Sequence, residues 1–178
     1  VHVSKDGGAT WNIISGNLPQ NRWISRVVAS AHKKERVYVT LNGYRNDDFT
    51  TYVYMSDDFG QTWINIATNL PTSPVNVLVE DNVNEDVLYL GTDNGVYVSL
   101  NKGSLWNDFS NGIPNVAVHD LVIQKKAKDL VVGTHGRSIY KVNLEPVQQL
   151  NEKVLAENLH VFEIKKIKLP KKNNALKF

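Results

Sequence analysis

Short apolar runs separated by polar turn residues repeat along this chain, and within the runs the residues follow the period of β-strands. The runs are rich in β-branched and aromatic side chains, and Asn, Asp or Gly bounds each one. They lie at 75–80, 87–91 and 95–99, again at 117–123, 130–133 and 138–142, and more loosely at 24–29, 37–41 and 52–56. With one more strand at a recurring tryptophan, the pattern predicts an all-β protein built from four-stranded units.

A repeated eight-residue motif accompanies these units. Residues 4–11 and 56–63 share the pattern Ser-x-Asp-x-Gly-x-Thr-Trp, while 99–106 has Asn in place of Asp and lacks Thr. We refer to the three segments as the first, second and third box. Their fixed positions are Ser4, Asp6, Gly8, Thr10, Trp11, Ser56, Asp58, Gly60, Thr62, Trp63, Ser99, Gly103 and Trp106. Each box tryptophan precedes a proline by eight residues, and successive tryptophans are 52 and 43 residues apart, which suits one four-stranded sheet per repeat.

The boxes are expected to be structural rather than catalytic or metal-binding. Asp6 and Asp58 fall in tight connections between strands, where a short carboxylate accepts backbone N–H groups and a nearby glycine adopts positive φ. A calcium loop needs more oxygen ligands at closer spacing. The tryptophans supply large apolar faces, so we predict that all three are buried against a neighbouring sheet, at one rim of the molecule.

The boxes resemble the Asp-box, or bacterial neuraminidase, repeat of sialidases, some xyloglucan-cleaving enzymes and sortilin-type propellers. Segments 43–49, 118–121 and 133–137 resemble a group of large bacterial proteins described as sortilin-like or glycosyl-hydrolase-like. The resemblance covers residues 1–164 and implies a β-propeller fragment of about three four-stranded antiparallel blades, from the C-terminal part of the propeller. It also implies a protein that is secreted, periplasmic or on the cell surface.

The chain divides into three parts by pattern. Residues 1–144 hold the blades. Pro146 opens a helical stretch, 147–159, with apolar residues on one side, and 160–164 alternates like an edge strand; we expect this helix and edge strand, 145–164, to pack on the last blade. Residues 165–178 carry six lysines in fourteen positions. This basic tail reads as a linker, with a phosphate-binding tail as the alternative.

Composition narrows the function classes. The absence of cysteine excludes disulfides and thiolate metal sites. Before residue 151 there are 13 Lys and Arg against 15 Asp and Glu, so the blades offer no basic surface for nucleic acid. No apolar run is long enough to span a membrane. His2, His32 and His160 lie singly, without metal-ligand spacing, and we predict neither a metal nor a cofactor.

A candidate ligand site follows from the path of a four-stranded meander, which puts the boxes at one rim and the second connections and first-strand starts at the other. This second rim carries forked cations and carboxylates suited to polar ligands, and flat aromatic faces. The candidates are Trp23, Arg26, Tyr44, Arg45, Asp47, Asp48, Asn76, Asp93, His119, Asp120, His135 and Arg137. An alternative is that Asp120 pairs with Arg137 or His135 and only ties strands together.

Two functions remain open on this basis. The first is a non-catalytic segment of a larger propeller protein that binds a glycan or peptide on the rim opposite the boxes, and whose apolar sheet faces meet the remaining blades or a second copy. The alternative is part of a sialidase- or xyloglucanase-like glycoside hydrolase whose catalytic residues lie mostly outside this segment. A sialidase-like site needs three arginines around a carboxylate, and a xyloglucanase-like site needs two opposed carboxylates.

Overall fold

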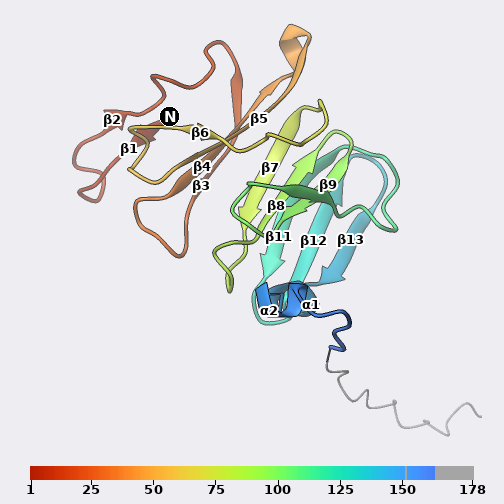
Figure 1. Cartoon of the computed structure of the whole chain (residues 1–178). Coiled ribbons are helices and arrows are strands. Elements are labelled where there is room, and N and C mark those ends of the chain that lie inside the picture. Colours follow the sequence, from red (N-terminus) through yellow and green to blue (C-terminus); the bar gives the residue numbers. More distant parts are fainter. Residues whose placement is uncertain (151, 163–178) are drawn as a thin grey trace, which may run out of the picture.

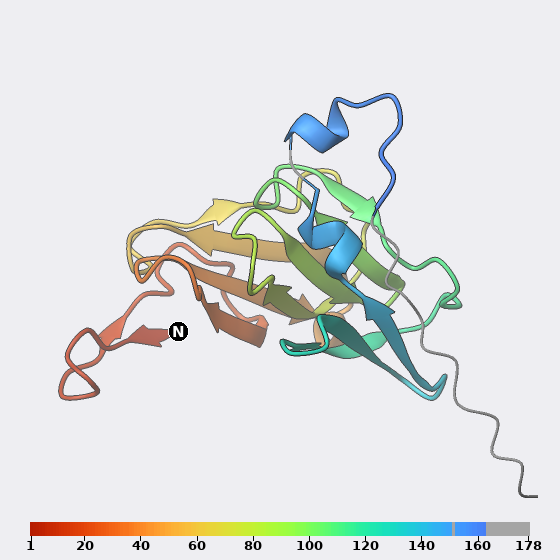
Figure 2. The same cartoon turned by 90° about the horizontal axis from the view of Figure 1, so that it is seen from below.

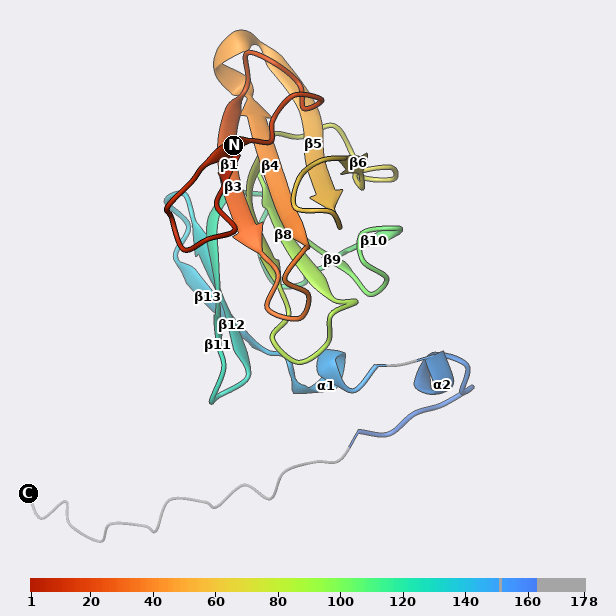
Figure 3. The same cartoon turned by 90° about the vertical axis from the view of Figure 1, so that its left-hand side faces the viewer.

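The computed structural model describes residues 1–150 and 152–162, which form four antiparallel sheets arranged one after another (Figures 1 and 3). Strand order within each sheet follows the chain. Sheet 1 is β1 (His2–Val3) and β2 (Asn12–Ile13); sheet 2 is β3 (Trp23–Ala29), β4 (Val37–Gly43), β5 (Asp48–Ser56) and β6 (Ile64–Asn65). Sheet 3 is β7 (Val75–Glu80), β8 (Leu88–Thr92), β9 (Gly95–Ser99) and β10 (Trp106–Asp108); sheet 4 is β11 (Val118–Gln124), β12 (Asp129–Thr134) and β13 (Ile139–Asn143). The predicted all-β fold of small four-stranded units is confirmed.

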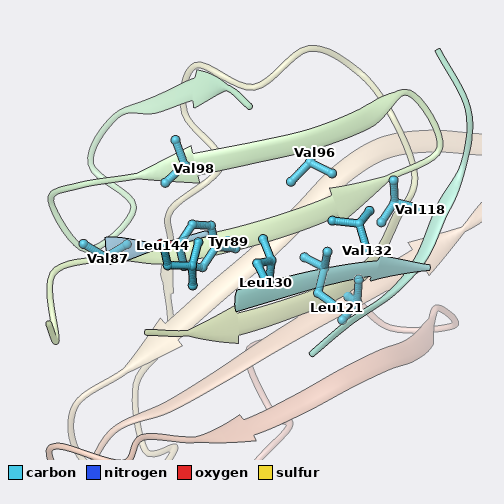
Figure 4. Packing of buried hydrophobic residues seen from close by; sticks show 10 residues of the cluster. Val87, Tyr89, Val96, Val98, Val118, Leu121, Leu130, Val132 and Leu144 are labelled. Carbon is cyan, nitrogen blue, oxygen red and sulfur yellow. The ribbon is translucent and has the colours of Figure 1, made fainter. Parts of the chain in front are cut away.

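The hydrophobic core lies between the faces of successive sheets. One cluster joins sheets 3 and 4 and includes Tyr89, Leu130 and Leu144 (Figure 4); a second joins sheets 2 and 3, and a third joins sheets 1 and 2. Strand β8 is buried along its whole length because sheet 3 has a neighbour on both faces. Each sheet therefore depends on the next for burial of its apolar side chains, as repeat units do.

The boxes form the connections between third and fourth strands, and each box is closed by its own side chains. In the second box, Asp58 accepts the Thr62 amide at 2.9 Å and the Thr62 hydroxyl at 2.6 Å, and the Gly60 amide donates to the Ser56 hydroxyl at 2.8 Å. The bonds from Thr62, followed by the one from Ser56, lower the pKa of Asp58 to about 2. The carboxylate is thus engaged within its own turn.

The first and third boxes follow the same plan. Thr10 bonds Asp6 through its amide and hydroxyl, and the pKa of Asp6 is likewise lowered to about 2. In the third box Asn101 takes the place of the aspartate and accepts the Leu105 amide at 2.8 Å. The amide oxygen of asparagine can accept this backbone bond as a carboxylate does, which explains why the degenerate box keeps the turn.

Two of the three box tryptophans seal the junctions between sheets. The Trp63 indole is 9% exposed and donates to the Ile14 carbonyl at 2.7 Å, and that of Trp106 is 3% exposed and donates to the Ile66 carbonyl at 2.6 Å. Trp11 immediately precedes β2, as Trp63 precedes β6, but it is 62% exposed. The prediction that all three are buried is wrong for Trp11, because sheet 1 has no sheet on its other face among the described residues.

Box glycines belong to the same junctions. Gly60 and Gly103 adopt φ of +83° and +86°, and a side chain at either position would collide with the isoleucine of the preceding sheet, Ile14 or Ile66 respectively. Glycine is therefore required for the backbone conformation and also for the close approach of the sheets.

After β13 the chain turns into two helices of four residues, α1 (Glu145–Gln148) and α2 (Glu152–Leu155). Leu144 is fully buried between sheets 3 and 4, and the side-chain amide of Gln148 donates to Asp81 at 3.0 Å. These contacts fix α1 at the lower end of the sheets in Figure 1, in front of them when the molecule is seen from below (Figure 2). The stretch from which we expected one longer helix is thus divided, and residues 160–162 are not in a strand. Residues 163–164 and the tail at 165–178 lie outside the described part. No described helix is long and apolar enough to cross a membrane.

Candidate functional site

The register of the strands separates the boxes from the rim on which we predicted a site. Strand β4 begins at Val37, opposite Ser56 of the second box, and ends at Gly43, opposite Asp48. Asp48 belongs to the inserted loop, residues 42–51, which makes the first repeat longer than the second. In sheet 3 the third box joins the other strands at Ser99, opposite Leu88, whereas the second connection lies beyond Thr92 and Gly95. Boxes and second connections therefore stand at opposite ends of the same strands.

A cavity of about 660 Å³ opens on the rim opposite the boxes and collects residues from sheets 2, 3 and 4. Its lining consists of Trp23, Asn42, Tyr44, Arg45, Asn76, Asp93, Ala117, His119 and His135. Seven of the twelve residues that the sequence proposed as ligand-binding line this one cavity. We refer to it as the rim pocket.

A chain of side-chain amide hydrogen bonds at the rim pocket links three sheets. Asn42 donates to the Asn76 side chain at 3.0 Å, and Asn76 donates to Asp93 at 2.8 Å and to the Val118 carbonyl at 3.2 Å. On its other side, Asn42 accepts the Tyr44 amide at 2.9 Å. These bonds fix the orientation of both asparagines, so the polar groups of the pocket are held in place before any ligand arrives.

One wall of the rim pocket is aromatic. Trp23 at the start of β3 and Tyr44 in the 3₁₀ helix η1 (Tyr44–Asn46) are both largely exposed. The Arg45 guanidinium lies over the Trp23 ring, 5.6 Å from its centroid, and Tyr44 meets Phe49 edge to face at 6.2 Å. Asp47 ends η1 with φ of 55°, so it shapes the turn and does not line the pocket. Exposed flat rings held by such contacts are suited to stacking on a ligand.

Asp48 anchors the inserted loop. Its carboxylate accepts the Arg22 guanidinium at 2.5 Å, the Tyr52 hydroxyl at 2.8 Å and the Thr50 amide at 3.0 Å. The bonds from Thr50, together with those from Tyr52 and Arg22, hold the pKa of Asp48 well below its ordinary value. The sequence placed Asp48 among the ligand-binding candidates, but Asp48 does not line the pocket. Its hydrogen bonds hold the loop that carries the aromatic wall.

Asp120 makes a different ion pair from the one considered in the sequence analysis. Its partner is Arg26, at 2.5 Å, and not Arg137 or His135; the pair connects β11 with β3, across the intervening β7. The neighbouring rings of His119 and His135 lie 5.1 Å apart at 30°. Arg137 is exposed and does not line the pocket. The described residues contain no cluster of three or more His, Cys, Asp or Glu with metal-binding geometry.

Two lining residues were not among the candidates. Asn42 marks the beginning of the insertion, but its central place in the amide chain depends on Asn76, which is 34 residues away. Ala117 precedes β11 and contributes only a small apolar surface. A proline-terminated turn before each first strand could have indicated the position of Ala117, but not that it faces a cavity.

No family model matches the chain, and the search of curated proteins gave no match. Among solved structures, an ancestral GH74 enzyme matches 79% of this chain with a TM-score of 0.58 at 17% identity. The GH74 enzyme of Niastella koreensis matches 67% with a TM-score of 0.56 at 22% identity, and the GH74 xyloglucanase of Xanthomonas campestris matches 69% with a TM-score of 0.52 at 15% identity. The chain shares its fold with part of the GH74 propellers. It spans about a fifth of the length of each, since 21% of each is covered.

Proposed function

We propose that this chain is a segment of a glycoside-hydrolase-like propeller protein and that its rim pocket is a subsite for a glycan. The observation that carries the proposal is the convergence of exposed Trp23 and Tyr44 with the hydrogen-bonded Asn76 and Asp93 in one cavity. Sugar rings offer apolar faces for stacking and hydroxyl groups at their edges for amides and carboxylates. A cavity that combines a few fixed polar groups with aromatic surface is typical of ligand sites.

A neutral glycan fits the charges better than an acidic one. Two of the rim arginines are already neutralised, Arg22 by Asp48 and Arg26 by Asp120. The lining residues carry the cation Arg45 and the carboxylate Asp93, so a carboxylate-bearing sugar would not meet the three arginines of a sialidase-like clamp. Similarity in fold to a GH74 xyloglucanase supports the same class of ligand. For a protein that binds a polysaccharide, we also propose a secreted, periplasmic or cell-surface location.

Within this site we assign the described residues to binding rather than bond cleavage. Glycoside hydrolysis uses a pair of carboxyl groups on either side of the scissile bond. Among the described residues that line the pocket, Asp93 is the carboxylate, and it already accepts a hydrogen bond from Asn76. The proposal therefore combines glycan binding by this segment with catalytic groups contributed from elsewhere in a larger propeller.

The experiment is a titration of the chain with a neutral xyloglucan oligosaccharide, with sialyllactose as the acidic comparison, followed by calorimetry. Trp23→Ala should weaken binding of the neutral sugar at least about tenfold, because a buried aromatic contact at a binding site is worth more than 1 kcal/mol. Trp11→Ala is the matched control, since it removes an equally exposed indole from the opposite rim. Preference for sialyllactose, or equal losses from the two variants, would refute a neutral-glycan subsite.

A further inference from the structure

Among the described residues, sheet 4 has no fourth strand beside its third strand, β13. The described residues give it β11, β12 and β13, whereas sheets 2 and 3 each have a fourth strand that starts next to a box tryptophan. A groove of about 340 Å³ lies beside β13 and is separate from the rim pocket, with which it shares no lining residue. It is lined by Asp108, Phe109, Asn111, Gly112, Ile113, Val132, Tyr140, Lys141 and Val142. The groove thus lies between β13 and the segment that follows β10.

In sheets 2 and 3 the equivalent position is filled by the fourth strand, and the hydrogen bonds of that strand show which groups the groove could bind. In sheet 2 the Ile66 amide donates to the Val53 carbonyl at 2.9 Å, and in sheet 3 the Phe109 amide donates to the Val96 carbonyl at 2.8 Å. Val53 and Val96 each lie three residues before the last residue of the third strand, which is Ser56 in β5 and Ser99 in β9. Tyr140 lies three residues before Asn143, the last residue of β13. Tyr140 is therefore the acceptor that corresponds to them in sheet 4.

The box tryptophans next to the fourth strands of sheets 2 and 3 identify a second hydrogen-bond acceptor. Trp63 and Trp106 donate to the carbonyls of Ile14 and Ile66, residues that follow the preceding box tryptophan by three positions. Phe109 follows Trp106 by the same three positions and lines the groove. The groove consequently matches an extended strand that begins with a tryptophan and carries an amide three residues later.

The same molecule displays such a strand at its other end. Trp11 is exposed, as is Ile13. Strand β2 pairs with β1 at His2 with Ile13 and at Val3 with Asn12, and the Ile14 amide donates to the Val1 carbonyl at 3.0 Å. The Trp11 indole donates to the Gly8 carbonyl of its own box, at 3.2 Å. Because an exposed indole gains much free energy on burial, this segment has a reason to leave β1.

We propose that β2 of a second copy adds to β13 as the fourth strand of sheet 4. The register follows from sheet 2, where Tyr54 faces Asn65 and Met55 faces Ile64: Lys141 should face Ile13 of the second copy, and Val142 should face Asn12. The Ile14 amide then donates to the Tyr140 carbonyl, and the Trp11 indole to the Phe109 carbonyl. The exchange replaces the two residue pairs with β1 by two with β13, replaces the Ile14 bond to the Val1 carbonyl by the one to Tyr140, and buries Trp11.

The exchange has a definite stoichiometry. If each copy gives β2 to its partner and accepts the partner's β2, two copies complete six four-stranded sheets from the described strands. Propellers commonly contain four to eight such sheets, and a head-to-tail contact of this kind forms a closed ring when the rotation between copies allows it. The contact does not depend on glycan binding.

The first test is the mass of the full chain by size-exclusion chromatography with light scattering, at concentrations from about 1 to 100 µM, a range that brackets typical transient association. We expect a species of twice 20.0 kDa, with association at least about tenfold weaker in Trp11→Ala. Trp23→Ala, which removes an indole of equal exposure from the rim pocket, should associate like the unmodified chain. A monomer at every concentration would overturn the proposal, as would a dimer that Trp11→Ala leaves unchanged.

The second test uses cysteine pairs, which are free of interference because the chain has no cysteine. Residues directly opposite on antiparallel strands have Cα atoms about 4.5–5.5 Å apart, within the range of a disulfide. The double variant Asn12→Cys, Val142→Cys should form a disulfide between copies. The double variant Asn12→Cys, Val3→Cys should hold β2 on β1 of its own copy and abolish dimerisation until the disulfide is reduced. Dimers that persist in the locked form would show that another surface joins the copies.

Discussion

The box tryptophans allow the packing between sheets to be tested by one matched pair of substitutions, Trp106→Ala and Trp11→Ala. Trp106 is almost completely buried. A buried tryptophan removes about 150–250 Å² from water, equivalent to about 4–6 kcal/mol at 25 cal/mol per Å², and its loss also leaves the Ile66 carbonyl without the indole donor. Measured tryptophan-to-alanine changes in cores cost about 3–5 kcal/mol, which is our expectation for Trp106. For exposed Trp11 we expect less than about 1 kcal/mol.

The assay is urea unfolding followed by far-ultraviolet circular dichroism, since fluorescence would change with the number of tryptophans. It should be run at low micromolar concentration, so that association through Trp11 does not contribute to the free energy of unfolding. Trp106→Phe should fall between the unmodified chain and Trp106→Ala, because it keeps a ring but loses the indole donor. Equal destabilisation by Trp11→Ala and Trp106→Ala would refute the conclusion that burial against the preceding sheet gives the box tryptophan its stabilising role.

Two further predictions concern charged groups near the boxes. Asp58 has a pKa of about 2 in the folded chain, below the ordinary 3.8, so its contribution to stability is complete above about pH 4 and is lost as the pH falls toward 2. Urea unfolding between pH 2 and 5 should therefore show a weaker acid dependence in Asp58→Asn, and an unchanged slope would contradict the role of the Thr62 bonds. Arg36 is buried and bonds Asp57 at 2.6 Å and Glu85 at 3.0 Å; Arg36→Met should cost about 1–3 kcal/mol and raise the pKa of Asp57 from about 2, where the Arg36 bond chiefly holds it. A carbon-13 titration of the Asp57 carboxyl checks this, and an unmoved pKa would show that Lys33 suffices.

Local features were predictable from the sequence because their causes are local. The box bonds join residues two to four positions apart, such as Ser56 and Thr62 with Asp58, so the motif alone indicates the turn. The alternation of connections likewise placed the second connections, which include the inserted loop and the turn at 93–95, on the rim opposite the boxes. Burial of Trp11 could not be judged in this way, because it depends on which sheet stands next to sheet 1, and no property of the box encodes that neighbour.

The pairing of charges on the rim was the least predictable part of the candidate site. Asp48 takes Arg22, 26 residues away, and Asp120 takes Arg26, 94 residues away. Several acids and arginines of similar chemistry occur on the same rim, so composition and rim assignment leave the partners undetermined. The distinction matters because it separates groups that position the loop, such as Asp48, from groups that face the pocket, such as Asn76.

The chain of amides from Asn42 through Asn76 to Asp93 has a consequence for how such proteins change over evolutionary time. Duplication of a single repeat would copy a box and its four strands, and the copy would pack wherever the preceding sheet offers a carbonyl to the box indole, as Ile14 and Ile66 do. It would not copy the pocket, because the pocket combines side chains from three consecutive repeats that are not interchangeable. Gain or loss of one repeat within this segment would move Asn42, Asn76 and Asp93 apart and remove the pocket, while leaving a well-packed molecule. Scaffold and recognition are therefore inherited in different units, the scaffold one repeat at a time and the pocket only as a set of three.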